Sequence, residues 1–279
     1  MKYIISYCSG GLGNRILPLS SCFELSTILN RTLGIVWNKT DSCFASFNSL
    51  FKNNILQIQL KDLKPEDVSI YSNESYIIGD NELNKDSSLF NLFNKVGAKD
   101  LSRLNEIYQD DKKYIIIYDN HFFLNLEKSS LLLNFLEPID SIMNEVDMFS
   151  KKNNISSEIL GIHARGTDFI EENLKGYIKI INDYIAFDSM IKILFCSDNG
   201  KWETKIHSKF PNNVIIRKKN SYIKRKNIFL NWVNNIHRSE TSVIEGLIDI
   251  HLLSITKFTV YNKKSTFAQL VNHLKNKNN

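Results

Sequence analysis

Residues suited to binding an anion stand in four short segments of the chain, and the first runs from Gly10 to Arg15. Closely spaced glycines permit positive φ and let the backbone approach a ligand, and the N–H groups that open a helix attract anions. The segment lacks the third glycine of a dinucleotide-binding fingerprint and the Lys-Ser/Thr pair of a P-loop. It therefore predicts either a phosphate-contacting turn or a purely structural one, and it does not support kinase or ATPase chemistry.

The second segment runs from Gly161 to Asp168 and holds a His and an Arg two residues apart. On a strand, His163 and Arg165 share one face. Arg165 then projects from the strand end as a permanently charged fork, which suits a phosphate. The alternative is a structural pair between these side chains and Asp168.

The third and fourth segments also follow predicted strands. Asp198 comes directly after one strand, where it either caps the next helix or contacts a ligand. Ser265 and Thr266 follow another strand and open the last helix, which is a further anion-binding geometry. Ligands of open parallel sheets bind at the carboxyl ends of the strands, so position alone makes these residues candidates.

Two carboxylates stand out on the helix predicted from Glu240 to Leu253. Glu240 lies in the first turn, where an acidic residue is favoured. Glu245 and Asp249 are four residues apart and share a face of a helix that is otherwise mostly apolar. A carboxylate in that setting is exposed, paired or bound to a ligand, because an unpaired buried charge is costly.

A basic run separates these segments. Between Lys205 and Arg238 there are nine Lys or Arg and no acid, and six of the nine lie in 217–226. Such a run is usually a solvated loop, but it also suits anionic lipid head groups or a diphosphate. No zinc-finger spacing or RNA-recognition aromatic motif accompanies it, so we expect no nucleic-acid partner.

The elements that position these residues alternate between strand and helix. Strands are predicted at 2–8, 33–37, 114–118, 159–164, 191–196, 214–216 and 257–261. Helices are predicted at 15–30, 127–136, 138–149, 172–187, 201–210, 240–253 and 266–274. The order of 52–111 is not predicted. This alternation indicates parallel sheets, so we expect two α/β domains, 1–150 and 151–279, joined by a polar linker at 151–154.

Composition sets the class of protein. The chain has 279 residues, of which 43% are hydrophobic and 23% are charged, and its net charge is +5. These values are typical of a globular protein with a packed core. The four cysteines form no C-x-x-C pair and lie among apolar neighbours, so we expect buried free thiols. Neither a signal peptide nor a membrane span is predicted, and we expect a cytoplasmic protein.

Together these residues resemble the fucosyltransferase superfamily, and most closely its α-1,6 branch of bacterial nodulation-factor and animal N-glycan core enzymes. The resemblance is best over about 158–270 and patchy over 1–40. Its most specific element is the run Leu-Ile-Asp-Ile-His-Leu-Leu-Ser at 247–254. The other matching elements are Gly11-Leu12-Gly13-Asn14-Arg15, His163-x-Arg165-x-x-Asp168, Ser197-Asp198, Glu240 and Ser265.

The resemblance implies a GT-B-like fold, with two Rossmann-like domains facing a cleft. It also implies an inverting, metal-independent glycosyltransferase that binds GDP-fucose in the C-terminal domain and the acceptor on the N-terminal side. On this interpretation Arg165 holds the diphosphate with His163 beside it, Ser265 completes the phosphate site, and Asp249 reads the guanine. The remaining donor-binding candidates are Gly11, Gly13, Asn14, Arg15, Asp198, Glu240 and Thr266.

The chain departs from the α-1,6 pattern at two positions. Gly166 stands where a second Arg is usual, and Asn173 stands where a carboxylate is usual. The catalytic base is therefore left open among Asp168, Glu171 and Glu172. The leading hypothesis is transfer of fucose to a glycan or lipid-linked saccharide, with peripheral contact to an anionic membrane through 217–226. The alternatives are a transferase of another GDP-sugar and a degenerate transferase that binds glycan or nucleotide without turnover.

Overall fold

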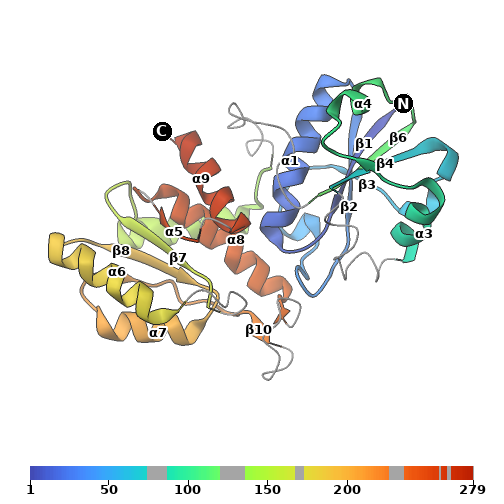
Figure 1. Ribbon diagram of the computed structural model, residues 1–279. Coiled ribbons are helices and arrows are strands. Elements are labelled where there is room, and N and C mark those ends of the chain that lie inside the picture. Colours follow the sequence, from blue (N-terminus) through green and yellow to red (C-terminus); the bar gives the residue numbers. More distant parts are fainter. Residues whose placement is uncertain are drawn as a thin grey trace. The chain divides into compact units, whose positions relative to one another are not determined.

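A computed structural model describes residues 1–73, 87–119, 136–166, 173–225, 236–257, 259–262 and 265–278. The chain forms two compact units. The first consists of Met1–Thr40 and Lys52–Glu137, and the second of Asp41–Phe51 and Pro138–Asn279. Figure 1 shows a separate sheet in each unit. The α/β class with two parallel sheets, as predicted from the strand and helix alternation, is confirmed.

The first unit is built on a six-stranded parallel sheet with the order β3-β2-β1-β6-β4-β5. Its strands are β1 (Tyr3–Cys8), β2 (Thr32–Trp37), β3 (Leu56–Gln57), β4 (Val68–Ser72), β5 (Lys99–Asp100) and β6 (Tyr114–Tyr118). Its helices are α1 (Leu12–Ile28), α3 (Ser87–Val96) and α4 (Leu104–Gln109), with short 3-10 turns at Leu60–Asp62 and Pro65–Asp67.

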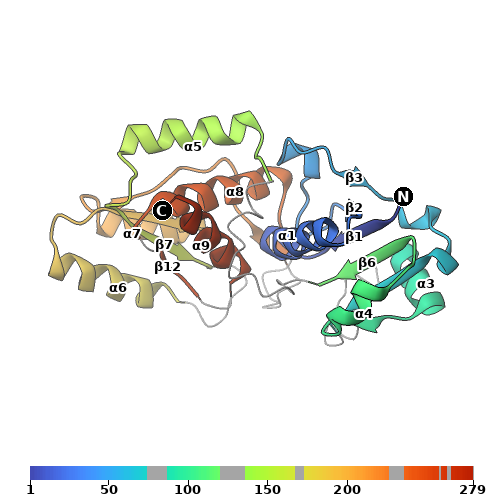
Figure 2. The same cartoon turned by 90° about the horizontal axis from the view of Figure 1, so that it is seen from above.

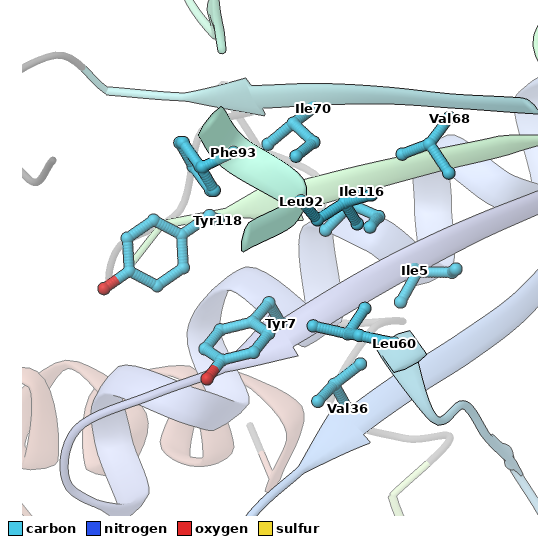
Figure 3. Packing of buried hydrophobic residues seen from close by; sticks show 10 residues of the cluster. All are labelled: Ile5, Tyr7, Val36, Leu60, Val68, Ile70, Leu92, Phe93, Ile116 and Tyr118. Carbon is cyan, nitrogen blue, oxygen red and sulfur yellow. The ribbon is translucent and has the colours of Figure 1, made fainter. Parts of the chain in front are cut away.

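The central strands of this sheet are buried on both faces. Ile116 and Tyr118 of β6 pack with Leu92 and Phe93 of α3 on one face, as Figure 3 shows. Ile115 and Ile117 pack on the other face with side chains of α1. Full burial of one such side chain contributes about 1.5–3 kcal/mol, which explains why β6 is continuously apolar.

The second unit is built on a four-stranded parallel sheet with the order β12-β7-β8-β9. Its strands are β7 (Leu160–Ala164), β8 (Ile193–Ser197), β9 (Val214–Ile215) and β12 (Thr259–Val260). Its helices are α5 (Asp140–Asn153), α6 (Leu174–Phe187), α7 (Gly200–Lys209), α8 (Glu240–Ile255) and α9 (Thr266–Asn278). Figure 1 shows α6 and α7 on one face of the sheet and α8 and α9 on the other. A short antiparallel pair, β10 (Lys224–Arg225) with β11 (Ile236–His237), precedes α8.

The chain passes between the units at different places from those expected. Lys151–Asn153 form the last turn of α5, and Asn154 ends that helix with a left-handed φ of 51°, so this polar run is not a linker. Helix α5 belongs to the second unit because it packs along α8, which Figure 2 shows. Residues 41–51 also join the second unit, where the backbone of Phe44 hydrogen-bonds to that of Arg238.

The remaining element predictions have mixed outcomes. The middle of the chain, 52–111, whose order is not predicted from the sequence, supplies β3, β4, β5, α3 and α4 to the first unit. The helix predicted at 127–136 lies outside the described residues except for Leu136. All four cysteines are free and buried, as predicted. In the part of the chain that is described, no helix is both long and apolar enough to cross a membrane.

Candidate functional site

The glycine-rich turn of the first unit connects β1 to α1. Gly10 is the residue that needs glycine, because its φ is +70° and a Cβ there would lie 2.9 Å from Nδ2 of Asn14. Gly11 precedes the helix with an ordinary φ of −74°, and Gly13 lies in the first helical turn. The turn thus has the tight geometry expected, but the strained position is one residue before the predicted pair.

Arg15 is fully buried within the first unit, at 0% exposure. Its guanidinium donates to the carbonyl oxygens of Gly10 at 2.8 Å and Asn38 at 2.7 Å, and to the Thr40 hydroxyl at 2.9 Å. It also lies 5.0 Å from the centre of the Trp37 ring. Arg15 therefore joins the glycine turn to the end of β2, which is a structural task.

In the second unit, two predicted segments meet at the carboxyl edge of the sheet. Strands β7 and β8 end in register at Ala164 and Ser197, so Arg165 and Asp198 follow neighbouring strand ends. The next residue, Gly166, donates its N–H to Oδ1 of Asp198 at 2.6 Å. Its carbonyl oxygen accepts from Nδ2 of Asn199 at 3.0 Å. Side chains from the end of β8 thus hold both polar backbone groups of the residue beside Arg165.

Gly166 is also closely surrounded by side chains. A Cβ at Gly166 would lie 2.8 Å from Cβ of Asn199 and 2.8 Å from the Trp202 ring, which is closer than real Cβ atoms approach. A larger residue at this position would therefore require Asn199 or Trp202 to shift.

His163 contacts the beginning of α9. Its ring stacks on Phe267 with a centroid distance of 3.9 Å and an interplanar angle of 9°, and it is buried. Phe267 lies one residue after Thr266, the first residue of α9. Ser265, just before the helix, has 0% exposure, and its hydroxyl has no hydrogen-bond partner among the described residues. The N-terminus of α9 therefore lies beside the end of β7 and carries an unsatisfied hydroxyl.

Helix α8 begins as predicted. The hydroxyl of Ser239 accepts from the N–H of Ser242 at 3.3 Å, and Glu240 is the first helical residue. This arrangement satisfies one of the orphan donors of the first turn.

Glu245 and Asp249 of α8 are both buried and both paired. Arg217 donates to Oε2 of Glu245 and, at 2.9 Å, to Oδ1 of Asp249. Lys219 lies 2.8 Å from Oδ2 of Asp249. Arg217 also contacts Glu145 of α5 at 2.8 Å. These two carboxylates are therefore neutralised by cations of their own unit.

The ionisation of this cluster follows from its burial and charges. Burial alone raises the pKa of Asp249, but the charges of Lys219 and Arg217 outweigh it, so the pKa of Asp249 is lowered. Burial alone lowers the pKa of Lys219, and the charges of Asp249 and Glu203 reverse that effect, so its pKa is raised. Asp249 and Lys219 thus favour each other's charged forms.

The cluster changes the interpretation of the basic run at 217–226. Arg217 and Lys219 are buried in ion pairs and face no solvent, whereas Lys218 and Lys224 are exposed. The run is therefore not a uniform basic surface. Buried and exposed residues alternate over 217–220, as in an extended segment.

Three predicted catalytic residues, Asp168, Glu171 and Glu172, lie outside the described residues. Within the described ranges, no group of three or more His, Cys, Asp or Glu side chains is placed to hold a metal ion. The second unit thus brings His163, Arg165, Asp198, Ser265 and Thr266 to one edge of its sheet. Asn199 belongs to the polar run that follows the predicted strand, whereas Trp202 and Phe267 were not predicted as supports of the site.

The chain is similar in fold to solved structures of known proteins. No protein-family model matches the chain, and no curated protein matches it. Among solved structures, NodZ α-1,6-fucosyltransferase co-crystallized with GDP matches with a TM-score of 0.66 at 16% identity, covering 97% of this chain and 91% of that chain. The fucosyltransferase NodZ from Bradyrhizobium matches with a TM-score of 0.65 at 17% identity, with the same coverage.

A third solved structure has an architecture similar to that of this chain. POFUT1 in complex with GDP matches with a TM-score of 0.60 at 12% identity, covering 99% of this chain and 94% of that chain. These likenesses extend over nearly the whole chain, at low sequence identity. The chain therefore has the two-sheet α/β fold of the NodZ and POFUT1 fucosyltransferases, the GT-B fold that its sequence motifs predict.

Proposed function

We propose that the chain is an inverting, metal-independent glycosyltransferase that uses a GDP-sugar, with fucose as the transferred sugar. The observation that carries the proposal is the carboxyl edge of the second sheet. There the residue after β7 is Arg165, its loop is held by the end of β8, and the N-terminus of α9 lies beside it. The similar NodZ and POFUT1 structures contain GDP.

In this proposal Arg165 binds the diphosphate of the donor. A guanidinium offers two parallel N–H donors to phosphate oxygens and keeps its charge at every physiological pH. Ser265 and the N–H groups that open α9 contribute at the same anion, because a helix N-terminus carries a partial positive charge. The unsatisfied hydroxyl of Ser265 supports this role. His163 and Asp198 position the two strand ends.

The first unit contributes its glycine turn of Gly11, Gly13 and Asn14 as a further donor contact in the proposal. Arg15 has a different part, because its guanidinium is buried against Gly10, Asn38 and Thr40. We assign Arg15 the role of shaping the turn. Glu240 remains a proposed donor contact at the start of α8.

Asp249, the proposed guanine contact, is already paired with two cations of the second unit. Its carboxylate already accepts hydrogen bonds from Arg217 and pairs with Lys219 inside the second unit. A purine would share these oxygens with two cations. In the proposal Asp249 first neutralises the buried charges of Arg217 and Lys219. It contacts the purine through the oxygen lone pairs that these cations leave unused.

The chemistry needs stabilisation of the leaving group and a base. Departure of GDP builds negative charge on the β-phosphate, which the Arg165 guanidinium and the helix N-terminus stabilise without a divalent ion. An inverting displacement also needs a base at the acceptor hydroxyl. We propose one of Asp168, Glu171 and Glu172, which follow Arg165 closely in the sequence.

Calorimetry in the presence of EDTA tests the donor site. We expect GDP to bind, and Arg165→Ala to weaken binding about tenfold or more, because a charge-assisted phosphate contact contributes about 1.5–3 kcal/mol. Arg103→Ala removes an exposed Arg of the first unit and serves as the matched control, with unchanged affinity. Equal competition by UDP-sugars would contradict the choice of GDP.

A binding protein without turnover is the second candidate. It is favoured by Gly166, which removes a second cation from the diphosphate site through packing against Asn199 and Trp202. Release of GDP from GDP-fucose in the presence of a panel of glycan acceptors decides between the two. Acceptor-dependent release establishes the enzyme, and tight binding without release establishes the binding protein.

A further inference from the structure

Two buried side chains hold the last residue of β8. The N–H of Ser197 donates to Oε1 of Glu203 at 2.9 Å, and its carbonyl oxygen accepts from Nζ of Lys219 at 2.6 Å. The ladder between β8 and β9 ends earlier, at the pair of Leu194 with Ile215. The end of β8 is therefore fixed by an acid from α7 and a base from the segment after β9, beyond the reach of the neighbouring strand.

Glu203 and Lys219 are each held in place by several contacts. The three ammonium hydrogens of Lys219 match three acceptors, namely the Ser197 carbonyl, Glu203 and Asp249. Glu203 accepts in addition from the hydroxyl of Tyr222 at 2.6 Å. Both side chains are buried, so loss of Lys219 would leave Glu203 without its cation, and loss of Glu203 would leave Lys219 paired with Asp249 alone.

From Ser197 the contacts lead to the loop that carries Arg165. The hydroxyl of Ser197 accepts from the N–H of Asn199 at 3.1 Å. Asp198 and Asn199 then bind the N–H and the carbonyl of Gly166, the residue next to Arg165. Each step is a hydrogen bond between described atoms, and the whole path lies within the second unit.

We propose that Glu203 and Lys219 are positioning residues for Arg165. Their hydrogen bonds fix the backbone of Ser197 and so the position of the next two residues, Asp198 and Asn199. These two side chains in turn hold the loop that carries Arg165, which binds the diphosphate. The assignment rests on the proposed function, because that function gives Arg165 its ligand. Glu203 does not touch the donor in this proposal, so its loss acts on the phosphate contact and leaves nucleoside binding intact. Lys219 also pairs with Asp249, the proposed purine contact, so its loss acts on both parts of the donor.

Hydrogen exchange tests the path without any ligand. In Glu203→Gln and Lys219→Met, we expect the Gly166 N–H to exchange about tenfold faster or more, because its hydrogen bond to Asp198 opens more often. Glu158→Gln and Lys201→Met change exposed residues of the same unit and serve as matched controls, with unchanged exchange. Unchanged Gly166 exchange in both buried variants would overturn the proposal.

A milder variant guards against loss of folding. Tyr222→Phe removes only the hydroxyl that Glu203 accepts from, so the fold is retained while the carboxylate is less firmly held. We expect a smaller but measurable acceleration at Gly166, of about twofold to fivefold. Exchange equal to that of the native chain in this folded variant would count against the path.

Calorimetry with GDP and with guanosine then separates positioning from general damage. We expect the Kd of GDP to rise about tenfold in Glu203→Gln, and the Kd of guanosine to change by less than about twofold. Equal losses for both ligands would overturn the positioning role. If the native chain binds no GDP, the proposed function fails, while the Gly166 exchange still decides whether Glu203 and Lys219 hold the loop.

Discussion

At the scale of single residues, the candidate site depends on backbone groups held by side chains. Gly166 illustrates this, because β7 has already ended and no strand pairs with it. Asp198 and Asn199 take the place of a neighbouring strand and satisfy its N–H and carbonyl. An unsatisfied buried backbone group would cost about 1–3 kcal/mol, so these bonds fix the course of the loop. The loop leaves no space at Gly166 for any side chain.

Replacement of Gly166 by Ala tests this packing. We expect the free energy of unfolding to fall by about 1–3 kcal/mol, because the new Cβ would overlap Asn199 and the Trp202 ring. Chemical denaturation measures the change. The matched control is Gly176→Ala in α6, where the nearest atom to a new Cβ lies 3.6 Å away. There we expect a gain of up to about 1 kcal/mol, because Ala favours the helix. Equal stabilities of the two variants would show that the loop can yield.

Sequence reasoning identified the positions of the site better than the partners of its residues. The strand ends at Ala164 and Ser197 were predictable because β-branched and apolar runs mark buried strands. The pairing of Asp249 was not predictable, since its partners Arg217 and Lys219 come about thirty residues earlier in the sequence. Their run looked solvated because it contains no acid. The acids that neutralise it belong to α5, α7 and α8.

At the scale of elements, the segment from Arg217 to Tyr222 joins several parts of the second unit. Arg217 contacts carboxylates of α5 and α8, and Lys219 contacts α7, α8 and the end of β8. Among the described residues no strand pairs with this segment, and its charged side chains attach it to the rest of the unit. Such buried pairs are costly to break, even where apolar residues could replace them at equal stability.

Single substitutions along this segment should therefore alternate in effect. We expect Arg217→Ala to lower the free energy of unfolding by about 3–5 kcal/mol, because Glu245 and Asp249 would lose a buried partner. Lys218→Ala changes an exposed neighbour and should stay within about 0.5 kcal/mol of the native chain. Urea unfolding of both variants gives the comparison. Similar losses in both would mean that the segment lies on the surface.

Strand length alone does not separate the predicted strands from those that were not predicted. β9 and β12 have two residues each and were predicted, whereas β4 has five buried residues and was not. β6 has five consecutive apolar or aromatic residues and is buried on both faces, so its pattern is unambiguous. β3 and β5 have two residues each and occupy the outer positions of the sheet. The two residues of such a strand give no period of their own to detect. Its place is set by the sheet that it joins.

At the scale of the whole molecule, each unit has its own core and its own charged cluster. In the first unit, Asp110 follows α4 and contacts side chains of β4 and β5. It accepts from Lys99 at 2.9 Å, from the Tyr71 hydroxyl at 2.8 Å and from the N–H of Lys112 at 2.9 Å. Burial alone raises the pKa of Asp110, but these hydrogen bonds outweigh it and lower the pKa to about 2.

This shift makes the stability of the first unit depend on pH in a defined direction. The pKa of an Asp in an unfolded chain is about 3.9, so the contribution of Asp110 is fully present above pH ~4 and is lost as the pH falls toward 2. We expect Asp110→Asn to lower the free energy of unfolding by about 1–2 kcal/mol at pH 6, discounted because Lys99 is 48% exposed. The gap between the two proteins should close at pH 2.

Trp37 can report this transition separately, because it is the only tryptophan of the first unit. In a background in which Trp202 and Trp232 are replaced by Phe, its fluorescence follows unfolding of the first unit in urea at each pH. Asp111→Asn changes the exposed neighbouring acid and is the matched control. A gap between native and Asp110→Asn proteins that persists unchanged at pH 2 would show that the hydrogen bonds to Asp110 do not lower its pKa. A gap that closes between pH 4 and pH 2 would place this acid-sensitive contact in the first unit, apart from the sheet edge that carries the proposed donor site.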